Sequence, residues 1–156
     1  MRILVTSDMH RRKSNFEKVI QHHNDIDEIF FLGDGVDDAE EIASFFKGKR
    51  FTLISGNCDF LSKHPSTVIT ELCGVKILAT HGHPYYVKSG TTALYEAAVQ
   101  NGVTLAIYGH THIQKAEYVN GVHMVCPGAL GGGDGGPGYA IIDVTPGGIV
   151  VNLLKL

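Results

Sequence analysis

Cysteines are few in this chain, and long apolar runs are missing. The three cysteines (Cys58, Cys73 and Cys126) are an odd number at irregular spacing, which argues against a disulfide framework and for a reducing compartment. No stretch is long and apolar enough to span a bilayer. The short apolar segment Met1–Ser7 runs straight into polar residues, so it does not have the form of a signal peptide. We therefore expect a cytoplasmic protein.

The chain also lacks a strong charge of either sign. Its 13 basic and 16 acidic residues give a formal net charge of -3, and no basic run of the kind that binds nucleic acids or membranes occurs. A small-molecule substrate is the partner that we expect. The 156 residues fit one domain with a sizeable core. Because no repeat or domain boundary divides the sequence, residues 1–156 are expected to form a single domain.

Short apolar runs in the first half predict buried strands at residues 3–5, 29–32 and 51–54. Two helices are expected between them. Ser14 is the predicted N-cap of the first helix, and Asp37 and Asp38 open the second. The predicted core residues are Phe16, Val19 and Ile20 in the first helix and Ile42, Phe45 and Phe46 in the second.

The second half is dominated by predicted hairpins. Asn120-Gly121, the strongest short hairpin signal, joins one pair of strands. The expected strands cover residues 67–72, 75–80, 105–108, 114–119, 122–125, 139–144 and 149–154, with a helix at 92–100. A βαβα-like half followed by hairpins predicts a mixed sheet with a second sheet packed on it. The fold class that we expect is an α/β sandwich of two mixed β-sheets flanked by helices.

Two histidines follow one of these strands in the segment Tyr108-Gly109-His110-Thr111-His112. An extended backbone sends alternate side chains to one face, so His110 and His112 can converge on one point and bind a transition metal there. The pair is a weak signal by itself, because a polar loop is the commoner explanation of such a pattern.

Other strands supply partners for these histidines. Strand carboxyl ends cluster along one edge of a parallel sheet, where open α/β folds bind ligands. Metal-binding side chains follow strand after strand, namely Asp8, His10, Asp34, Asn57, His81, His110 and His112. Seven groups exceed the needs of one ion, so the count favours two metals with Asp34 as the bridging carboxylate.

Five ordered motifs then resemble the calcineurin-like metallophosphoesterase superfamily, and the single-domain YfcE-like phosphodiesterase branch in particular. They are Asp8-Met9-His10, Gly33-Asp34-Gly35, Gly56-Asn57-Cys58-Asp59, His81-Gly82-His83 and Gly109-His110-Thr111-His112. The resemblance implies one metal bound by Asp8, His10, Asp34 and His112, and another bound by Asp34, Asn57, His81 and His110.

The activity implied by this resemblance is metal-dependent hydrolysis of phosphodiesters. Two divalent ions about 3.5–4 Å apart would polarise the phosphoryl group and hold the attacking hydroxide. The expected catalytic residues are Asp34, Asn57, His81 and His110. Manganese is the preferred ion, while nickel, iron, zinc and magnesium suit the same ligands. A homodimer is a reasonable expectation for a small enzyme.

The sequence departs from the superfamily pattern at Cys58, where many members carry a histidine that is thought to protonate the leaving group. A thiol is a poorer proton donor than imidazolium near neutral pH, so we expect phosphodiesters with good leaving groups, or help from metal, water or His83. Cys126-Pro127-Gly128-Ala129 also replaces the usual Asn-Pro-Gly-Ser. The glycine-rich segment 131–138 is either a lip over the site or an ordinary loop.

Two other functions are compatible with the sequence. The first is a catalytically weak metal-binding scaffold that binds protein partners, as the retromer subunit of this fold does. Such a protein typically loses a ligand, whereas all seven candidates are present here. The second is a structural or storage metal centre, which would need closed coordination.

Overall fold

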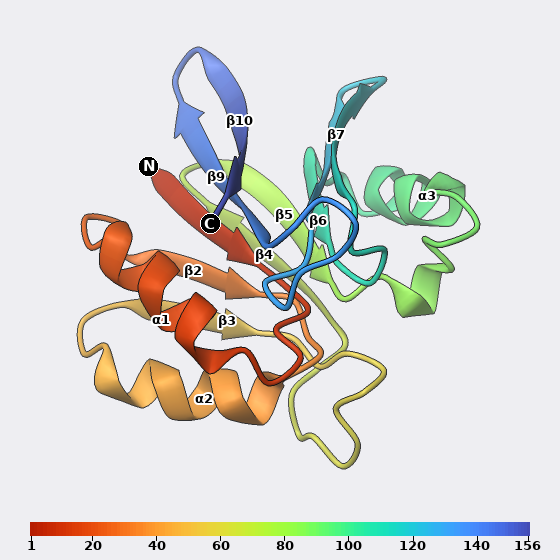
Figure 1. Ribbon diagram of the computed structural model, residues 1–156. Helices are drawn as coiled ribbons and strands as arrows, with labels where there is room; N and C mark the ends of the chain where they lie inside the picture. The colour runs from red at the N-terminus through yellow and green to blue at the C-terminus, as the bar shows by residue number, and fades with distance from the viewer.

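The first sheet is built around the N-terminal strand. A computed structural model describes residues 1–156, and its first sheet has the strand order β10-β9-β1-β2-β3. Its strands are β1 (Arg2–Thr6), β2 (Glu28–Phe31), β3 (Arg50–Leu53), β9 (Gly138–Thr145) and β10 (Gly148–Lys155). Helices α1 (Lys13–His22) and α2 (Val36–Phe45) connect the three parallel strands and cover one face of this sheet (Figure 1).

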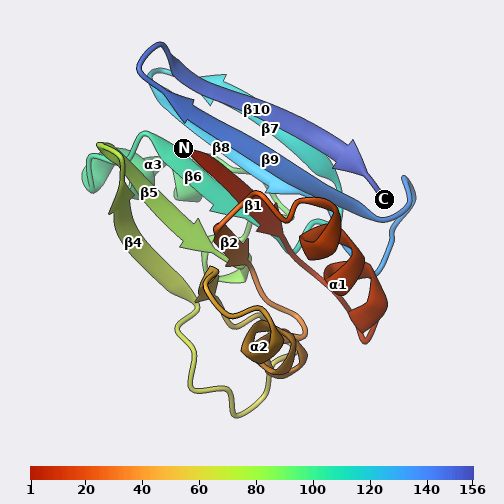
Figure 2. The same cartoon turned by 90° about the vertical axis from the view of Figure 1, so that its left-hand side faces the viewer.

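The second sheet has the strand order β4-β5-β6-β8-β7. Its strands are β4 (Thr67–Leu72), β5 (Val75–Thr80), β6 (Leu105–Tyr108), β7 (Gln114–Val119) and β8 (Val122–Pro127). A short 3₁₀ turn (His83–Tyr85) and helix α3 (Thr92–Gln100) lie between β5 and β6. Figures 1 and 2 show the two sheets stacked on each other, with α3 on the far side of the second sheet.

Side chains that alternate between the two faces of each strand divide the core into layers. On β1, Leu4 packs with the α1 and α2 residues, whereas Ile3 and Val5 point between the two sheets. On β6, Ile107 faces the space between the sheets and Ala106 packs beneath α3. Successive side chains of a strand point to opposite faces, so strands buried on both faces are apolar throughout. The predicted α/β sandwich of two mixed sheets is confirmed.

The C-terminal hairpin corrects our expectation of one sheet followed by another. Strands β9 and β10 return to the first sheet, where β9 pairs antiparallel with β1 through Ile3↔Ile142 and Leu4↔Ile141. Because β2 occupies only one side of β1, the other side needs a partner for its backbone N–H and C=O groups. The hairpin supplies that partner and makes the first sheet mixed.

Two details of the helices predicted from the sequence were wrong. Ser14 is not the N-cap of α1, because Arg12 takes that position and no side chain caps the helix. Phe45 is 74% exposed, although Ile42 is buried. Each three-residue step on an α-helix falls about 60° short of a full turn. Val36, Ala39 and Ile42 are buried, but the next step along the same row places Phe45 on the solvent side of the helix.

None of the helices has the length and apolarity needed to cross a bilayer.

Candidate metal centre

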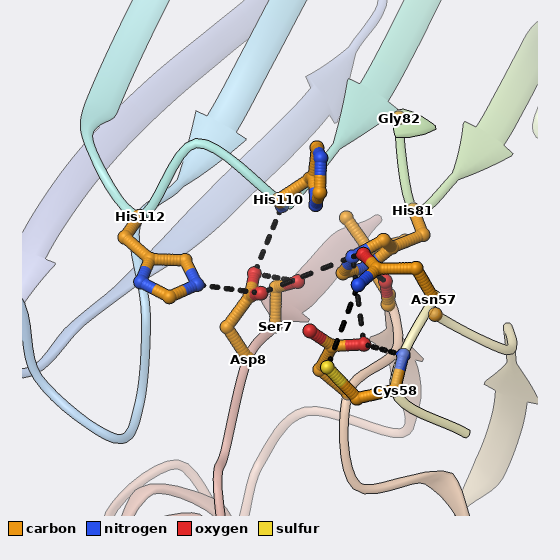
Figure 3. A network of polar contacts seen from close by, with 12 residues as sticks. Ser7, Asp8, Asn57, Cys58, His81, Gly82, His110 and His112 are labelled. Carbon is orange, nitrogen blue, oxygen red and sulfur yellow. Dashed lines mark hydrogen bonds and ion pairs between the residues drawn. The ribbon is translucent and has the colours of Figure 1, made fainter. Parts of the chain in front are cut away.

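The seven predicted ligands all follow carboxyl ends of parallel-paired strands. Two follow β1, one follows β2, one follows β3, one follows β5 and two follow β6. Figure 3 shows His112 on one side of the Asp8 carboxylate and His81, Asn57 and Cys58 on the other side. The two stacked sheets therefore contribute to one site.

Asp8 lies at the centre of this site and is fully buried. Its Oδ2 accepts hydrogen bonds from the Ser7 hydroxyl at 2.5 Å and from the His110 backbone N–H at 3.0 Å. Its Oδ1 accepts no hydrogen bond. Burial alone would raise the pKa of this carboxyl, but the neighbouring His112 and His81 imidazoles and the Ser7 hydroxyl lower it. The carboxylate is therefore fixed in orientation, with one anionic oxygen left for another partner.

The first group around this oxygen consists of Asp8, His10 and His112. His112 Nε2 lies 3.0 Å from Asp8 Oδ1 and His10 Nε2 lies 3.8 Å from it. The two Nε2 atoms are 3.1 Å apart. The nearby Asp8 carboxylate raises the pKa of His112. Two imidazole nitrogens thus converge on one buried carboxylate oxygen.

The second group consists of Asp8, Asp34 and His81. His81 Nδ1 donates to the Leu32 carbonyl oxygen at 2.6 Å, so in the neutral ring Nε2 carries a lone pair. That Nε2 lies 3.1 Å from Asn57 Oδ1, 3.6 Å from Asp34 Oδ1 and 4.0 Å from Asp8 Oδ1. Four acceptor atoms facing one another require a cation or a proton between them.

These contacts show how the predicted ligands fit a metal. Asp8, His10, Asp34, His81 and His112 form the two groups, and the Asn57 amide oxygen joins the second. The donor set of carboxylate, imidazole and amide groups suits divalent transition metals. Asp8 Oδ1, which accepts no hydrogen bond, is the kind of buried acceptor that such an ion would satisfy. The residues present therefore fit the predicted metal centre.

Two features differ from the predicted ligand arrangement. Asp8, rather than Asp34, is the carboxylate common to both groups. The His110 ring belongs to neither group, although its centroid lies 5.0 Å from that of His81. Burial, followed by the charges of His81 and Lys88, lowers the pKa of His110 to about 4. A neutral imidazole beside the site is in the form that metal binding needs.

The backbone at the site is strained. Ten non-glycine residues have positive φ, and five of them are predicted ligands. Those five are Asp8, His10, Asp34, His110 and His112, with φ between 44° and 69°. The left-handed conformation costs roughly 1–2 kcal/mol for a residue with a Cβ atom. Such strain concentrates at functional sites, where surrounding contacts hold it in place.

Two glycines allow the close approach of the strand ends. A Cβ atom on Gly56 would lie 2.1 Å from Asp34 Oδ1, and one on Gly109 would lie 2.0 Å from Ser7 Oγ. Neither separation is possible for a side chain. These positions in two of the sequence motifs are therefore occupied by glycine for steric reasons.

The roles of two supporting side chains were missed, because they depend on hydrogen bonds that the sequence does not display. Ser7 orients Asp8 through the hydrogen bond described above. Asp59 accepts hydrogen bonds from four backbone N–H groups, those of Asp34, Gly35, Val36 and Gly56, at 2.7–3.0 Å. It therefore ties the Asp34 loop and the start of α2 to the loop after β3. Only the common motif Gly56-Asn57-Cys58-Asp59 could have directed attention to Asp59.

Cys58 and His83 lie next to the centre. The exposed Cys58 donates its backbone N–H to Asp34 Oδ1 at 2.9 Å. Partial burial, followed by the Asp34 carboxylate, raises the pKa of the Cys58 thiol. The His83 ring lies 5.4 Å from the His81 ring, centroid to centroid, and burial lowers the pKa of His83. Neither group is a strong proton donor at neutral pH.

The glycine-rich segment begins against the site. Leu130 and Gly131 donate backbone hydrogen bonds to the Ser7 and Asp8 carbonyl oxygens, both at 2.9 Å. A Cβ atom on Gly133 would lie 3.3 Å from the His112 carbonyl oxygen. The start of the segment is thus part of the structure that holds the Asp8 loop.

Comparison with known proteins identifies the family. Residues 1–147 match the calcineurin-like phosphoesterase superfamily domain. The chain belongs to this superfamily. A "probable metallophosphoesterase" from Methanocaldococcus jannaschii is 30% identical over 132 residues, covering 83% of this chain and 68% of that protein. The crystal structure of a "predicted phosphoesterase" from Streptococcus pneumoniae has a TM-score of 0.81 and 26% identity, covering 99% of this chain and 88% of the other.

Two further solved structures have lower sequence identity and share the fold of this chain. An archaeal phosphodiesterase has a TM-score of 0.73 and 24% identity, covering 99% of this chain and 100% of the other. Vps29 from Entamoeba histolytica, solved in complex with Zn²⁺, has a TM-score of 0.76 and 19% identity, covering 99% and 98%. The family assignment makes this chain a metal-dependent phosphoesterase, and it confirms the resemblance stated from the motifs.

The Gly56 contact gives a test of the site. We expect Gly56→Ala to lower the affinity for Mn²⁺ by about 10- to 100-fold, the usual effect of disturbing groups that orient a metal ligand, because the new methyl group displaces Asp34. Isothermal titration calorimetry measures this affinity, and circular dichroism checks folding. Gly147→Ala, whose nearest neighbouring atom is 3.7 Å away, is the matched control. Unchanged Mn²⁺ affinity in folded Gly56→Ala would contradict the assignment.

Proposed function

We propose that this chain is a phosphodiesterase with a binuclear metal centre. One metal would be held by Asp8, His10, Asp34 and His112, and the other by Asp34, Asn57, His81 and His110. The observation that carries the proposal is the Asp8 carboxylate oxygen, which is buried, accepts no hydrogen bond and has a cluster of candidate ligands on each side of it. The whole of residues 1–156 would act as one domain, with manganese as the preferred ion.

The spatial distribution of the candidate ligands supports two ions. His10 and His112 lie on one side of Asp8, and His81 and Asn57 lie on the other. A single ion would leave one of these groups with acceptor atoms facing each other, which costs free energy unless a proton lies between them. Two ions satisfy both groups, provided that Asp8 or Asp34 contributes to each. Bound divalent ions supply polarisation of the phosphoryl group and activation of water.

The protein groups have separate tasks in this proposal. Ser7 and the His110 backbone N–H hold the Asp8 carboxylate in one orientation. Leu32 fixes the His81 ring with Nε2 toward the site, and Cys58 and Asp59 position the Asp34 loop through its carboxylate and its backbone. This preorganisation removes reorganisation of the site from the reaction barrier.

The preference for diesters rests on Cys58. Hydrolysis of an alkyl phosphomonoester needs a proton for its leaving group, and a thiol with a raised pKa supplies it poorly. His83 is also a weak candidate, since its lowered pKa keeps the ring neutral near pH 7. Diesters with good leaving groups need less of this assistance. The archaeal phosphodiesterase of the same fold supports this substrate class.

A scaffold that binds metal and protein partners is the second candidate. Its support is the similarity to Vps29, whose Zn²⁺ complex shows that a protein of this fold can hold a metal. The two candidates differ in turnover, because a scaffold would bind metal without metal-dependent hydrolysis. The complete set of seven candidate ligands favours the enzyme.

The first test is hydrolysis of bis(p-nitrophenyl) phosphate and p-nitrophenyl phosphate after chelation and readdition of manganese, nickel, magnesium or zinc. We expect metal-dependent turnover that falls at least about 100-fold in Asp34→Asn, because the substitution removes a metal-binding charge. Asp27→Asn, an exposed aspartate outside the site, is the control. Metal binding without turnover for any of these ions would favour the scaffold instead.

The second test concerns the leaving group. Cys58→His places an imidazole at this position and should raise the ratio of alkyl phosphomonoester hydrolysis to bis(p-nitrophenyl) phosphate hydrolysis by about tenfold or more, since general acid catalysis contributes about 10²–10⁴-fold. Cys73→His adds an imidazole to an exposed turn and serves as the control. A monoester-to-diester ratio that stays the same in Cys58→His would refute the role given to the thiol.

A further inference from the structure

A cavity of about 460 Å³ lies beside the metal centre, and only two of the residues that line it, His10 and Asp34, are proposed metal ligands. Arg11 and Phe60 line it together with His10, Asp34 and Cys58. Its volume is within the about 300–1,000 Å³ typical of small-molecule sites. The cavity therefore has room for more of the substrate than the phosphoryl group.

Arg11 is the one arginine or lysine in this lining, and its guanidinium makes no ion pair. Three carboxylates beside the metal ligands share the cavity, but two of them are already engaged. Asp38 pairs with Lys13 at 2.8 Å, and both oxygens of Asp59 accept backbone hydrogen bonds. The third, Asp37, is exposed. Arg11 is thus available to an anionic ligand.

The backbone conformation fixes the position from which the Arg11 side chain extends. His10 and Arg11 have φ of 44° and 67°, a conformation that is sparsely populated without other support. Hydrogen bonds from the Met9 and His10 backbone N–H groups to the Asp34 carbonyl oxygen, at 3.1 and 3.3 Å, hold this turn. The guanidinium is therefore presented from a turn attached to two proposed metal ligands.

Phe60 offers an aromatic ring on the same cavity. Its side chain is 84% exposed, so the ring packs on little of the protein. The preceding residue, Asp59, is anchored by backbone N–H groups of the Asp34 loop. A fixed backbone with an exposed ring is suited to stacking on a flat ligand group. Leu61 is also exposed but does not line the cavity.

We propose that Arg11 and Phe60 select phosphoesters that carry a flat aromatic ring, such as a nucleobase. Arg11 pairs with a phosphate oxygen, and Phe60 stacks on the ring. This inference rests on the proposed function, because it places the phosphate at the metal centre. It adds a substrate class, nucleotide-like esters, to the proposed reaction.

The test compares two probes that differ only in the base. Adenosine 5′-monophosphate and ribose 5-phosphate are titrated into the Mn²⁺-loaded protein by isothermal titration calorimetry. We expect the wild type to bind the adenosine compound about 5- to 150-fold more tightly, the effect of one base–aromatic stack. Phe60→Ala should remove this difference, and Phe60→Trp should retain it. Arg11→Ala should weaken both probes about tenfold, as loss of a charge-assisted contact does.

The neighbouring residues provide matched controls. Leu61→Ala and Arg12→Ala remove an exposed apolar side chain and an exposed guanidinium that do not line the cavity, and they should change neither affinity more than about twofold. Failure of the wild type to bind the adenosine compound, equal affinities for both probes, or an equal loss in Phe60→Ala and Leu61→Ala would each overturn the inference.

Hydrolysis of bis(p-nitrophenyl) phosphate by the same preparations separates this inference from the proposed function. Turnover without a preference for the adenosine compound overturns the inference alone. A preference for the adenosine compound without turnover overturns the hydrolase and supports the binding role of Arg11 and Phe60.

Discussion

The structure of the site depends on one constraint, the burial of a carboxylate oxygen that has no hydrogen bond. An anionic oxygen in this position is costly unless a cation compensates it. Asp8 Oδ1 has imidazole nitrogens of His112, His10 and His81 within 4.0 Å, yet none of them is aligned to donate to it. In the proposed binuclear centre, a divalent ion on each side would satisfy the oxygen and the ring nitrogens together. The same constraint explains why Ser7 and the His110 backbone are needed to orient the carboxylate.

The fold serves this constraint by bringing two sheets together at one edge. Parallel pairing of β1, β2 and β3 in one sheet, and of β5 and β6 in the other, places their carboxyl ends side by side. Glycines at positions 56 and 109 then let the loops approach to distances that any side chain would prevent. The strained backbone of Asp8, Asp34 and His110 is a further cost. Apolar packing between and outside the sheets offsets it.

Much of this arrangement could be predicted from the sequence, because strong local patterns coincide with it. Apolar runs predicted the strands, Asn120-Gly121 predicted a hairpin that is present, and the order of motifs predicted the superfamily. The return of β9 to β1 could not be predicted, since nothing local in residues 138–145 specifies which strand edge they pair with. Phe45 was misplaced because spacing along a helix does not show where its contact with the sheet ends.

The site itself was predictable only in part. Residue types identified the carboxylate, amide and imidazole ligands, but sharing between the two groups depends on three-dimensional position, and it falls to Asp8 in this structure. The support from Asp59 depends on backbone N–H groups of another loop, which no residue pattern displays.

The central claim is that two metal ions share a carboxylate at this site. Electron paramagnetic resonance during Mn²⁺ titration of the metal-free protein tests it most directly. The account predicts two Mn²⁺ ions per chain and the spectrum of an exchange-coupled pair, as expected for ions about 3.5–4 Å apart. One ion per chain, or two ions without magnetic coupling, would contradict the account.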